Sequence, residues 1–334
     1  MKQKHVNIPI FLPELACKNK CVFCNQKQIT TTQNIPSIQE IINKIELHLS
    51  TIDKNTKVQI AFFGGNFTGL SFKMQESYLQ AAYRFIEQGT VESIRISTRP
   101  DYITKNNLLL LKSFGVKDIE LGAQSFDPEV LRLSKRNHSA EDIRTASHII
   151  REHGFSLGLQ MMIGLPGDTY IKAMHTAQSI IDCKANTSRI YPCLVIAHTE
   201  LAHMYKQNQY IPLSLQTAVA WSADIYSLLQ KHGIQVLRVG LHPNADFESP
   251  EVCIAGPYHQ SFKQLVCSEI WKQRFLKHIT VQKGKLYIEV APAEIAYAVG
   301  YKSSNKTYLR SKFGWVSIRA NTTLQNDEFT YTII

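Results

Sequence analysis

The 334-residue sequence contains no apolar run of roughly 18 residues, the length needed to cross a bilayer, although 44% of its residues are hydrophobic. The opening segment MKQKHVNIPIFLPE has lysines but no apolar core followed by small cleavage residues, so no secretory signal is expected. Internal repeats and low-complexity linkers are also missing. These absences predict a globular, cytoplasmic protein that has no membrane partner.

Cysteine is sparse, and its seven copies are an odd number. Without an export signal, an odd count argues for a reducing compartment and against a disulfide framework. Three of the seven lie within the stretch CKNKCVFC (17–24), and the next one is Cys183. Since a zinc site normally uses four protein ligands, this group is one ligand short.

Three interpretations of Cys17, Cys21 and Cys24 compete. Structural zinc needs a fourth ligand, and the nearest candidate, His5, lies at the far end of the preceding predicted strand. Buried structural cysteines are disfavoured because the neighbouring residues are polar. In a 4Fe–4S cluster each iron takes one thiolate, so three cysteines leave one iron open to another ligand. This third interpretation accounts for the missing cysteine, while the zinc site and the buried structural cysteines stay open as alternatives.

Acidic residues are almost missing from one stretch, 272–319. It holds ten lysines and arginines and only two acids, Glu289 and Glu294, which gives it +8 of the chain's net charge of +10. A segment that carries most of the excess charge of a protein is typical of a surface that binds a polyanion. The C-terminal part is therefore expected to contact a polyanion.

Short β-branched runs alternate with helix-period segments through the first 240 residues. Apolar strands alternating with helices indicate a parallel sheet, and six or seven such units favour a partial or full (β/α) barrel. In such barrels functional residues lie at the carboxyl ends of the strands. The predicted strands are 5–12, 58–65, 93–98, 118–124, 158–165, 189–196 and 234–240.

After about residue 260 the pattern changes to a small α+β module. We expect a helix, a hairpin in ITVQKGKLYIEV that turns at Lys283-Gly284, two short helices around VGYKSSNK and a closing strand WVSIRA. The predicted domains are therefore a barrel over 1–258 and a basic module over 259–334.

The spacing CxxxCxxC, with Phe23 before its last cysteine, resembles the radical S-adenosylmethionine (SAM) superfamily. The resemblance implies a barrel of the radical SAM type and a 4Fe–4S cluster on Cys17, Cys21 and Cys24. It further implies that the open iron is chelated by SAM. An electron, which an external flavodoxin- or ferredoxin-type donor supplies to the cluster, then splits the sulfonium bond to give a 5′-deoxyadenosyl radical.

Later strand ends carry further pieces of the family pattern in the expected order: FFGGNFTG, ISTRPD, LGAQSFDPEVLRLSKRNH, LQMMIGLPGDT and LVIAHTEL. The third of these resembles oxygen-independent coproporphyrinogen oxidase, and it implies that Arg136 pairs with the SAM carboxylate. The glycines after the second strand allow backbone to approach the SAM ammonium closely. The implied cofactor-binding residues are Phe23, Gly64, Gly65, Asn66, Ser97, Thr98, Gln124, Arg136, Gln160 and Val195.

Residues 5–268 are similar to the radical SAM portion of the Elongator catalytic subunit, through STRPDYI, the segment that begins TELAHMYKQNQY, and AGPYHQSFKQLV. That subunit modifies tRNA uridines and also carries an acetyltransferase domain. No segment of this sequence resembles that domain, so the same modification is not carried over.

The segment PAEIAYAVGYKSSNKTYLRSKFGWVSIR resembles a bacterial KH module, whose GxxG loop clamps a nucleic-acid backbone. Here Gly300 is present, but Ser303 stands at the second glycine position. The alternative is a helix pair that only caps the barrel. The RNA-contacting residues implied by the resemblance are Gly300, Lys302, Lys306, Arg310 and Lys312.

Three functions remain open at this point. The favoured one is a radical SAM enzyme that modifies a tRNA or rRNA base. The second is a radical SAM enzyme that acts on a small molecule such as a porphyrin, with a merely structural C-terminal module. The third is a non-catalytic RNA-binding protein that uses an iron–sulfur cluster as a redox sensor.

Overall fold

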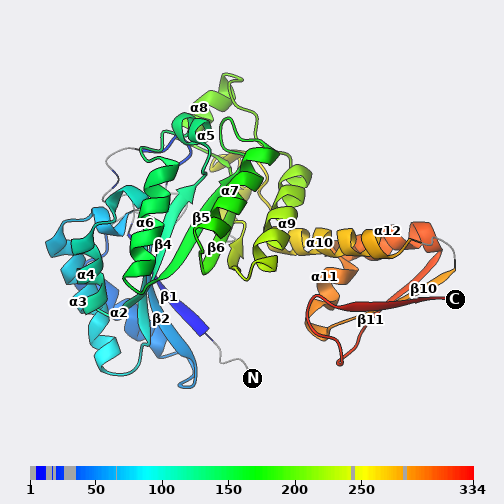
Figure 1. Cartoon of the computed structure of the whole chain (residues 1–334), viewed down its shortest axis with the longest axis horizontal. Helices are drawn as coiled ribbons and strands as arrows, with labels where there is room; N and C mark the ends of the chain where they lie inside the picture. The colour runs from blue at the N-terminus through cyan, green and yellow to red at the C-terminus, as the bar shows by residue number, and fades with distance from the viewer. Residues whose placement is uncertain are drawn as a thin grey trace.

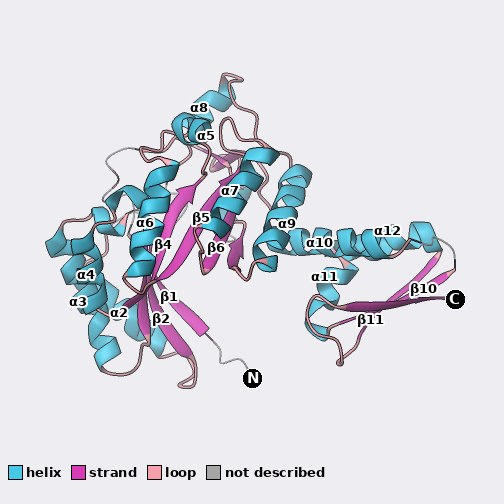
Figure 2. Cartoon of the chain, viewed as in Figure 1, coloured by secondary structure: helices cyan, strands magenta, loops and turns pink. Residues whose placement is uncertain are grey.

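A computed structural model describes residues 5–12, 17, 20–25, 35–64, 66–241, 245–280 and 284–334. Within these residues, seven parallel strands form one curved sheet whose spatial order follows the chain. Figure 2 shows this curved sheet with its helices packed outside it. The strands are β1 (His5–Phe11), β2 (Lys57–Phe63), β3 (Ser93–Thr98), β4 (Val116–Gln124), β5 (Ser156–Ile163), β6 (Thr187–Pro192) and β8 (Gln235–Val239).

Helices connect the strands and cover the convex face of the sheet (Figure 1). They follow from the amphipathic segments of the sequence, whose apolar side chains pack on strand residues such as Ile94, Ile96, Ile119 and Leu121. The predicted (β/α) barrel is confirmed in its partial form. The principal helices are α2 (Ile38–Leu49), α3 (Phe72–Glu87), α4 (Lys105–Ser113), α6 (Ala140–Glu152), α7 (Tyr170–Asp182) and α9 (Leu215–Lys231).

The first of these helices begins at the capping box that the sequence predicts. Ser37 Oγ accepts from Glu40 N (3.3 Å), and Ser37 N donates to Glu40 Oε2 (2.7 Å). The same reciprocal pair, Ser139 with Asp142, begins α6. The second box matters for the site, because it fixes the turn that leads from Arg136 into α6.

The concave face of the sheet is polar. Arg95 Nη2 lies 3.1 Å from Asp118 Oδ1, and Arg189 Nε donates to Glu120 Oε2 (2.7 Å). Arg189 Nη1 also donates to the Tyr191 hydroxyl (3.3 Å). Burial acts to lower the pKa of Arg189, but Glu120 and Tyr191 raise it overall, so this guanidinium stays charged. Paired charges line the inside of the barrel, whereas aliphatic side chains fill the space under the helices.

Short elements cover the carboxyl ends of the strands. Strand β7 (Val195–Ile196) pairs with β9 (Cys253–Ala255), and both lie beside α5 (Pro128–Leu133) and α8 (Glu200–Lys206). Together they form a second apolar cluster, which includes Val22 of the cysteine loop. The loop after β1 is therefore packed against elements that are far from it in sequence.

The C-terminal module contains α10 (Phe262–His278), β10 (Lys285–Val290), α11 (Ile295–Val299), α12 (Ser304–Phe313), β11 (Trp315–Ala320) and β12 (Phe329–Ile333). Its sheet has the order β11-β10-β12, with β10 parallel to β11 and antiparallel to β12. The described residues do not form the predicted hairpin: 279–280 are not strand, 281–283 lie outside the described residues, and β10 finds its antiparallel partner in β12 instead. Strand β12 was not predicted from the sequence.

Helix α10 belongs to two cores (Figure 1). Phe262, Val266 and Ile270 pack in the barrel core, whereas Trp271 and Phe275 pack in the core of the module. The predicted domain boundary after residue 258 falls just before this helix. No helix in the part of the chain that the structure describes is long and apolar enough to span a bilayer.

Candidate functional site

The loop after β1 carries the three clustered cysteines. Cys21 is buried, and Cys17 and Cys24 are half-buried. The loop is held by backbone hydrogen bonds, from Val22 N to Ser134 O (3.2 Å) and from Leu201 N to Val22 O (2.8 Å). Among the described residues, no three His, Cys, Asp or Glu side chains gather closely enough to hold a metal ion. The structure thus brings the cysteines to one loop but does not bring their sulfurs to one point.

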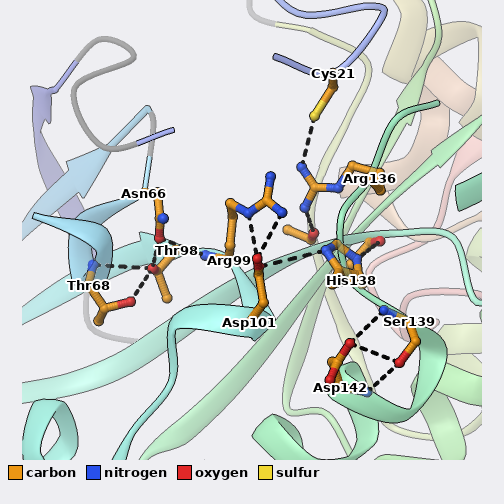
Figure 3. Close-up of polar contacts among 12 residues, drawn as sticks. Cys21, Asn66, Thr68, Thr98, Arg99, Asp101, Arg136, His138, Ser139 and Asp142 are labelled. Atoms are coloured by element: carbon orange, nitrogen blue, oxygen red, sulfur yellow. Dashed lines mark hydrogen bonds and ion pairs between the residues drawn. The ribbon is translucent and has the colours of Figure 1, made fainter. Parts of the chain in front are cut away.

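Arg136 reaches this loop from the turn after α5. Its Nη1 donates to Cys21 Sγ (3.2 Å), as Figure 3 shows. Its Nη2 donates to Gly122 O near the end of β4 (2.5 Å). The buried Nε of Arg136 has no hydrogen-bond partner among the described residues. The family resemblance predicted a cofactor contact for Arg136, and the structure places its guanidinium beside a predicted cluster ligand.

Arg99 supplies a second guanidinium here, and unlike the half-buried Arg136 it is buried; it was not among the predicted site residues. It follows β3 directly and forms a two-pronged pair with Asp101, with both N–O distances 2.9 Å. Burial acts to lower the pKa of Arg99, but Asp101 and then the charges of Cys21 and Cys17 raise it overall. Both thiols therefore lie within electrostatic reach of Arg99. An arginine placed directly after an apolar strand, in ISTRPD, was the available signal.

His138 lies behind this pair, and its side chain is fully buried. Its Nε2 lies 3.2 Å from Ala123 O. Its Nδ1 is 3.9 Å from Asp101 Oδ1 (Figure 3). Burial and then the charge of Arg136 lower the pKa of His138 to about 3. A neutral imidazole thus packs against the carboxylate that holds Arg99.

The lowered pKa of His138 predicts a specific pH dependence of stability. Because its pKa falls from 6.5 to about 3 on folding, the stability it contributes is present above pH 6.5 and is lost as the pH falls toward 3. Between pH 7 and pH 5 the wild type should lose about 2 kcal/mol more unfolding free energy than His138→Gln. Urea unfolding at both pH values measures this difference.

The exposed His175 provides the control for this comparison. His175→Gln should keep the pH dependence of the wild type. If His138→Gln also keeps it, the imidazole is charged in the folded protein.

Gln124, at the end of β4, meets Gln160 within β5. Gln160 Nε2 donates to Gln124 Oε1 (3.2 Å), and Gln124 has a positive φ of 66° where the register between the two strands shifts. The irregularity turns the end of β4 so that Gly122 O is available to Arg136. The predicted cofactor residues Gln124 and Gln160 are therefore adjacent. Both lie near Gly122, whose carbonyl accepts from a third predicted cofactor residue, Arg136.

Asn66 and Thr98 are buried and bonded to each other. Thr98 Oγ1 donates to Asn66 Oδ1 (2.6 Å), which also accepts from Arg99 N (3.2 Å). These two side chains join the ends of β2 and β3. The neighbouring Ser97 has a buried hydroxyl with no hydrogen-bond partner among the described residues.

Three of the remaining predicted cofactor residues, Phe23, Gly64 and Val195, follow β1, β2 and β6 in the chain, at the carboxyl-end edge of the sheet, here called the rim. Phe23 is half-buried against the small apolar cluster, and Val195 is fully buried within it. Gly64 has a φ of 81°, which favours glycine at the turn that ends β2. Gly65 lies outside the described residues.

The predicted RNA-contacting residues lie far from this rim, on the C-terminal module. Gly300 has a φ of 86°, and a Cβ there would meet Ser304 Oγ at 2.5 Å, so the position requires glycine. The turn after it is anchored on α10, because Tyr301 N donates to Ser268 Oγ (3.0 Å) and Asn305 Nδ2 donates to Ser268 O (2.8 Å). The basic side chains around this turn are exposed or half-buried: Lys302, Lys306, Arg310 and Lys312.

The residues at the rim fit an iron–sulfur cluster with an anionic ligand. Three cysteines share one loop, and two guanidiniums face it: the buried Arg99, which follows β3, and the half-buried Arg136 in the turn after α5. Positive charge of this kind stabilises thiolates, which are the form that binds iron. The unpartnered Arg136 Nε and Ser97 hydroxyl remain as donors for a polar group between the strand ends.

Comparison with known families agrees with this arrangement. Residues 15–180 match the model of the radical SAM superfamily, and residues 185–272 match that of the radical SAM C-terminal domain. The chain belongs to the radical SAM superfamily and is an enzyme of that class.

Curated relatives share modest identity with this chain. The tRNA uridine(34) acetyltransferase of Dehalococcoides mccartyi is 23% identical over 267 residues, 70% of this chain and 58% of the relative. That of Methanocaldococcus infernus is 26% identical over 195 residues, 52% and 36% of the two chains. The heme chaperone HemW of Bacillus subtilis is 25% identical over 257 residues, 75% and 65% of the two chains. The matches thus span only 36% to 58% of these two acetyltransferases.

Among solved structures, the Elp3 of Methanocaldococcus infernus with an N-terminal deletion superposes with a TM-score of 0.67. It is 22% identical, and the match covers 81% of this chain and 64% of that one. At this identity the likeness concerns the fold.

Proposed function

We propose that this enzyme holds a 4Fe–4S cluster on Cys17, Cys21 and Cys24 and cleaves SAM to a 5′-deoxyadenosyl radical in order to modify a base of tRNA or rRNA. The observation that carries the proposal is the position of Arg136, whose guanidinium joins Cys21 Sγ to the end of β4. A cation fixed between a cluster ligand and the strand ends suits a cofactor whose carboxylate must lie next to the cluster.

When bound, the cluster supplies the electron that breaks the sulfonium bond of SAM. The protein residues bind and orient. Arg136 pairs with the carboxylate of SAM, and Arg99, held by Asp101, balances the charge of the thiolates. The other SAM contacts are proposed for Phe23, Gly64, Gly65, Ser97, Gln124, Gln160 and Val195, whereas the predicted contacts Asn66 and Thr98 are assigned a supporting role.

In this proposal Asn66 and Thr98 act by fixing the strand ends, because their side chains bond to each other. Ser97 has the unpartnered hydroxyl and makes the direct contact. The electron comes from an external one-electron donor of the flavodoxin or ferredoxin type.

Two observations support RNA as the substrate. The net charge of the chain is concentrated in 272–319, and the first curated relatives carry names that say they act on tRNA uridine. The basic side chains on α12 and the turn before it are exposed to solvent or half-buried. We therefore assign phosphate contacts to Lys302, Lys306, Arg310 and Lys312, with Gly300 shaping the turn.

The phosphate contacts predict a salt dependence of RNA binding. The affinity for RNA falls as salt rises, so the slope of log affinity against log salt is negative. Replacing Lys302 and Arg310 by glutamine should make this slope less steep by about 0.7 to 0.9 for each lost contact. Filter binding of tRNA at several salt concentrations measures the slope. The control replaces Lys73 and Lys105, which are exposed on the barrel, by glutamine and removes the same charge. Equal slopes in the two double variants would contradict the assignment.

The function itself is tested by anaerobic incubation of the cluster-loaded enzyme with SAM, a reductant and total cellular RNA, followed by mass spectrometry. We expect 5′-deoxyadenosine and a mass change in one nucleoside. A cluster-loaded protein that never cleaves SAM would favour the redox sensor. SAM cleavage that leaves every nucleoside unchanged would favour a small-molecule substrate.

A further inference from the structure

The C-terminal sheet exposes an aromatic pair. The rings of Tyr287 on β10 and Trp315 on β11 have centroids 4.7 Å apart and planes inclined by 48°. Trp315 lies opposite Lys285 in the strand register, so Tyr287 is its diagonal neighbour, a position from which aromatic side chains touch. Trp315 is 40% exposed and Tyr287 is half-buried.

The residues around this pair share one side of the sheet. Side chains alternate along a strand, and the buried Leu286, Ile288 and Val290 of β10 pack in the module's core with residues of α10 and α12. Figure 2 shows α10 and α12 on that side of the sheet. The opposite side, here called the outer sheet face, consists of Lys285, Tyr287, Glu289, Trp315, Ser317, Arg319, Thr330 and Thr332.

The composition of the outer sheet face indicates what covers it. It contains no aliphatic side chain, whereas the core of a protein–protein interface is apolar and poor in charge. Its aromatic rings stand beside two basic residues and three hydroxyls. The acid of this face, Glu289, accepts a hydrogen bond from Asn321 Nδ2 (2.9 Å).

Aromatic rings with basic and hydroxyl neighbours on an open sheet are the chemistry that recognises unpaired nucleobases. Bases stack on the rings, cations contact the phosphates, and hydroxyls reach base edges or ribose. A cross-strand aromatic pair also stabilises a sheet by itself, but that role needs neither exposure nor basic neighbours.

We propose that the outer sheet face binds unpaired bases of single-stranded RNA, with Trp315 and Tyr287 as the stacking platform and Lys285 and Arg319 as phosphate contacts. This inference rests on the proposed RNA substrate and narrows it to RNA that presents unpaired nucleotides. The face is distinct from the turn around Gly300, because that turn is anchored on α10, on the other side of the sheet.

The test compares a labelled short oligouridine with a duplex RNA of the same length by fluorescence anisotropy. Trp315→Ala should weaken oligouridine binding at least about tenfold and leave duplex binding unchanged, because paired bases cannot stack on the ring. Trp315→Phe should retain most of the affinity. Phe72→Ala, which removes a 51% exposed ring from α3, is the matched control and should have no effect.

Salt dependence separates stacking from charge. Trp315→Ala should leave the salt slope of oligouridine binding unchanged, whereas Lys285→Gln should lower it by about 0.7, the effect of one lost phosphate contact on a single strand. Thermal melts verify that each variant is folded.

Other outcomes overturn the inference in distinguishable ways. If the wild type binds both RNAs and Trp315→Ala binds oligouridine equally well, the outer sheet face is not the site, while the proposed RNA substrate stands. If the wild type binds neither RNA, both proposals fail. If Trp315→Ala only dissociates a dimer, as measured by light scattering, the face belongs to a second copy of the chain.

Discussion

Replacing Cys21 by alanine is expected to give a folded protein that assembles no 4Fe–4S cluster and releases no 5′-deoxyadenosine from SAM. Cys21 is the middle cysteine of the loop, and its thiol is the one that contacts Arg136. Two remaining thiolates cannot supply one ligand to each of three irons, so the loss should be complete rather than partial. Iron and sulfide analysis after anaerobic reconstitution measures it.

Cys183→Ala is the matched control for this prediction. Cys183 is half-buried at the end of α7, and burial raises the pKa of its thiol, which disfavours the thiolate that binds metal. That variant should keep its full iron content. A Cys21→Ala protein that binds as much iron as the wild type would show that the cluster lies elsewhere. Circular dichroism separates loss of the cluster from loss of the fold.

Replacing Arg136 by alanine is the second large expected effect: SAM affinity should fall about 10- to 100-fold while iron content stays unchanged. A hydrogen bond to a charged partner contributes about 1.5–3 kcal/mol, and that range gives the expected factor. Arg136→Lys should recover little of the lost SAM affinity. The planar guanidinium of arginine can contact Cys21, Gly122 O and a carboxylate at the same time, whereas the compact ammonium of lysine cannot. Equilibrium dialysis of SAM against the reconstituted protein measures the change.

The control for Arg136 lies one turn earlier in the chain. Arg132 is exposed on α5, so Arg132→Ala removes the same charge without touching the site. Unchanged SAM affinity in Arg136→Ala would refute the carboxylate contact. If the cluster itself is lost, the principal role of Arg136 is to hold the Cys21 thiolate, which is the contact that the structure contains.

Much of the fold can be predicted from the sequence because local patterns determine it. Seven apolar strands alternate with amphipathic helices, and parallel pairing in chain order follows from that alternation. The capping box at Ser37 and Glu40 is likewise a local signal, and it is confirmed. The C-terminal sheet depends on distant pairing instead. The dipeptide Lys283-Gly284 indicated a hairpin, but β10 pairs with β12, about forty residues later in the chain.

The residues of the candidate site also fall into two groups, those that local sequence patterns reveal and those that only distant contacts bring together. The cysteine spacing and Arg136 are visible as motifs, whereas Arg99, Asp101 and His138 act through contacts between separate strand ends. An arginine that follows a strand is usually solvated, and only the structure, in which His138 of the turn after α5 lies beside Asp101, shows that Arg99 is buried. Sequence reasoning assigned Thr98 and Asn66 to the cofactor, and it could not reveal that their side chains bond to each other.

Helix α10, which packs in both cores, has a mechanical consequence. Its 17 residues form one rod of about 25 Å, at 1.5 Å per residue. Since one half is embedded in the barrel and the other in the C-terminal module, bending between the two parts would require breaking helical hydrogen bonds. Under the proposed function, the separation between the module and the cysteine loop would therefore be fixed, and an RNA strand too short to span it would bind the module without reaching the proposed cluster.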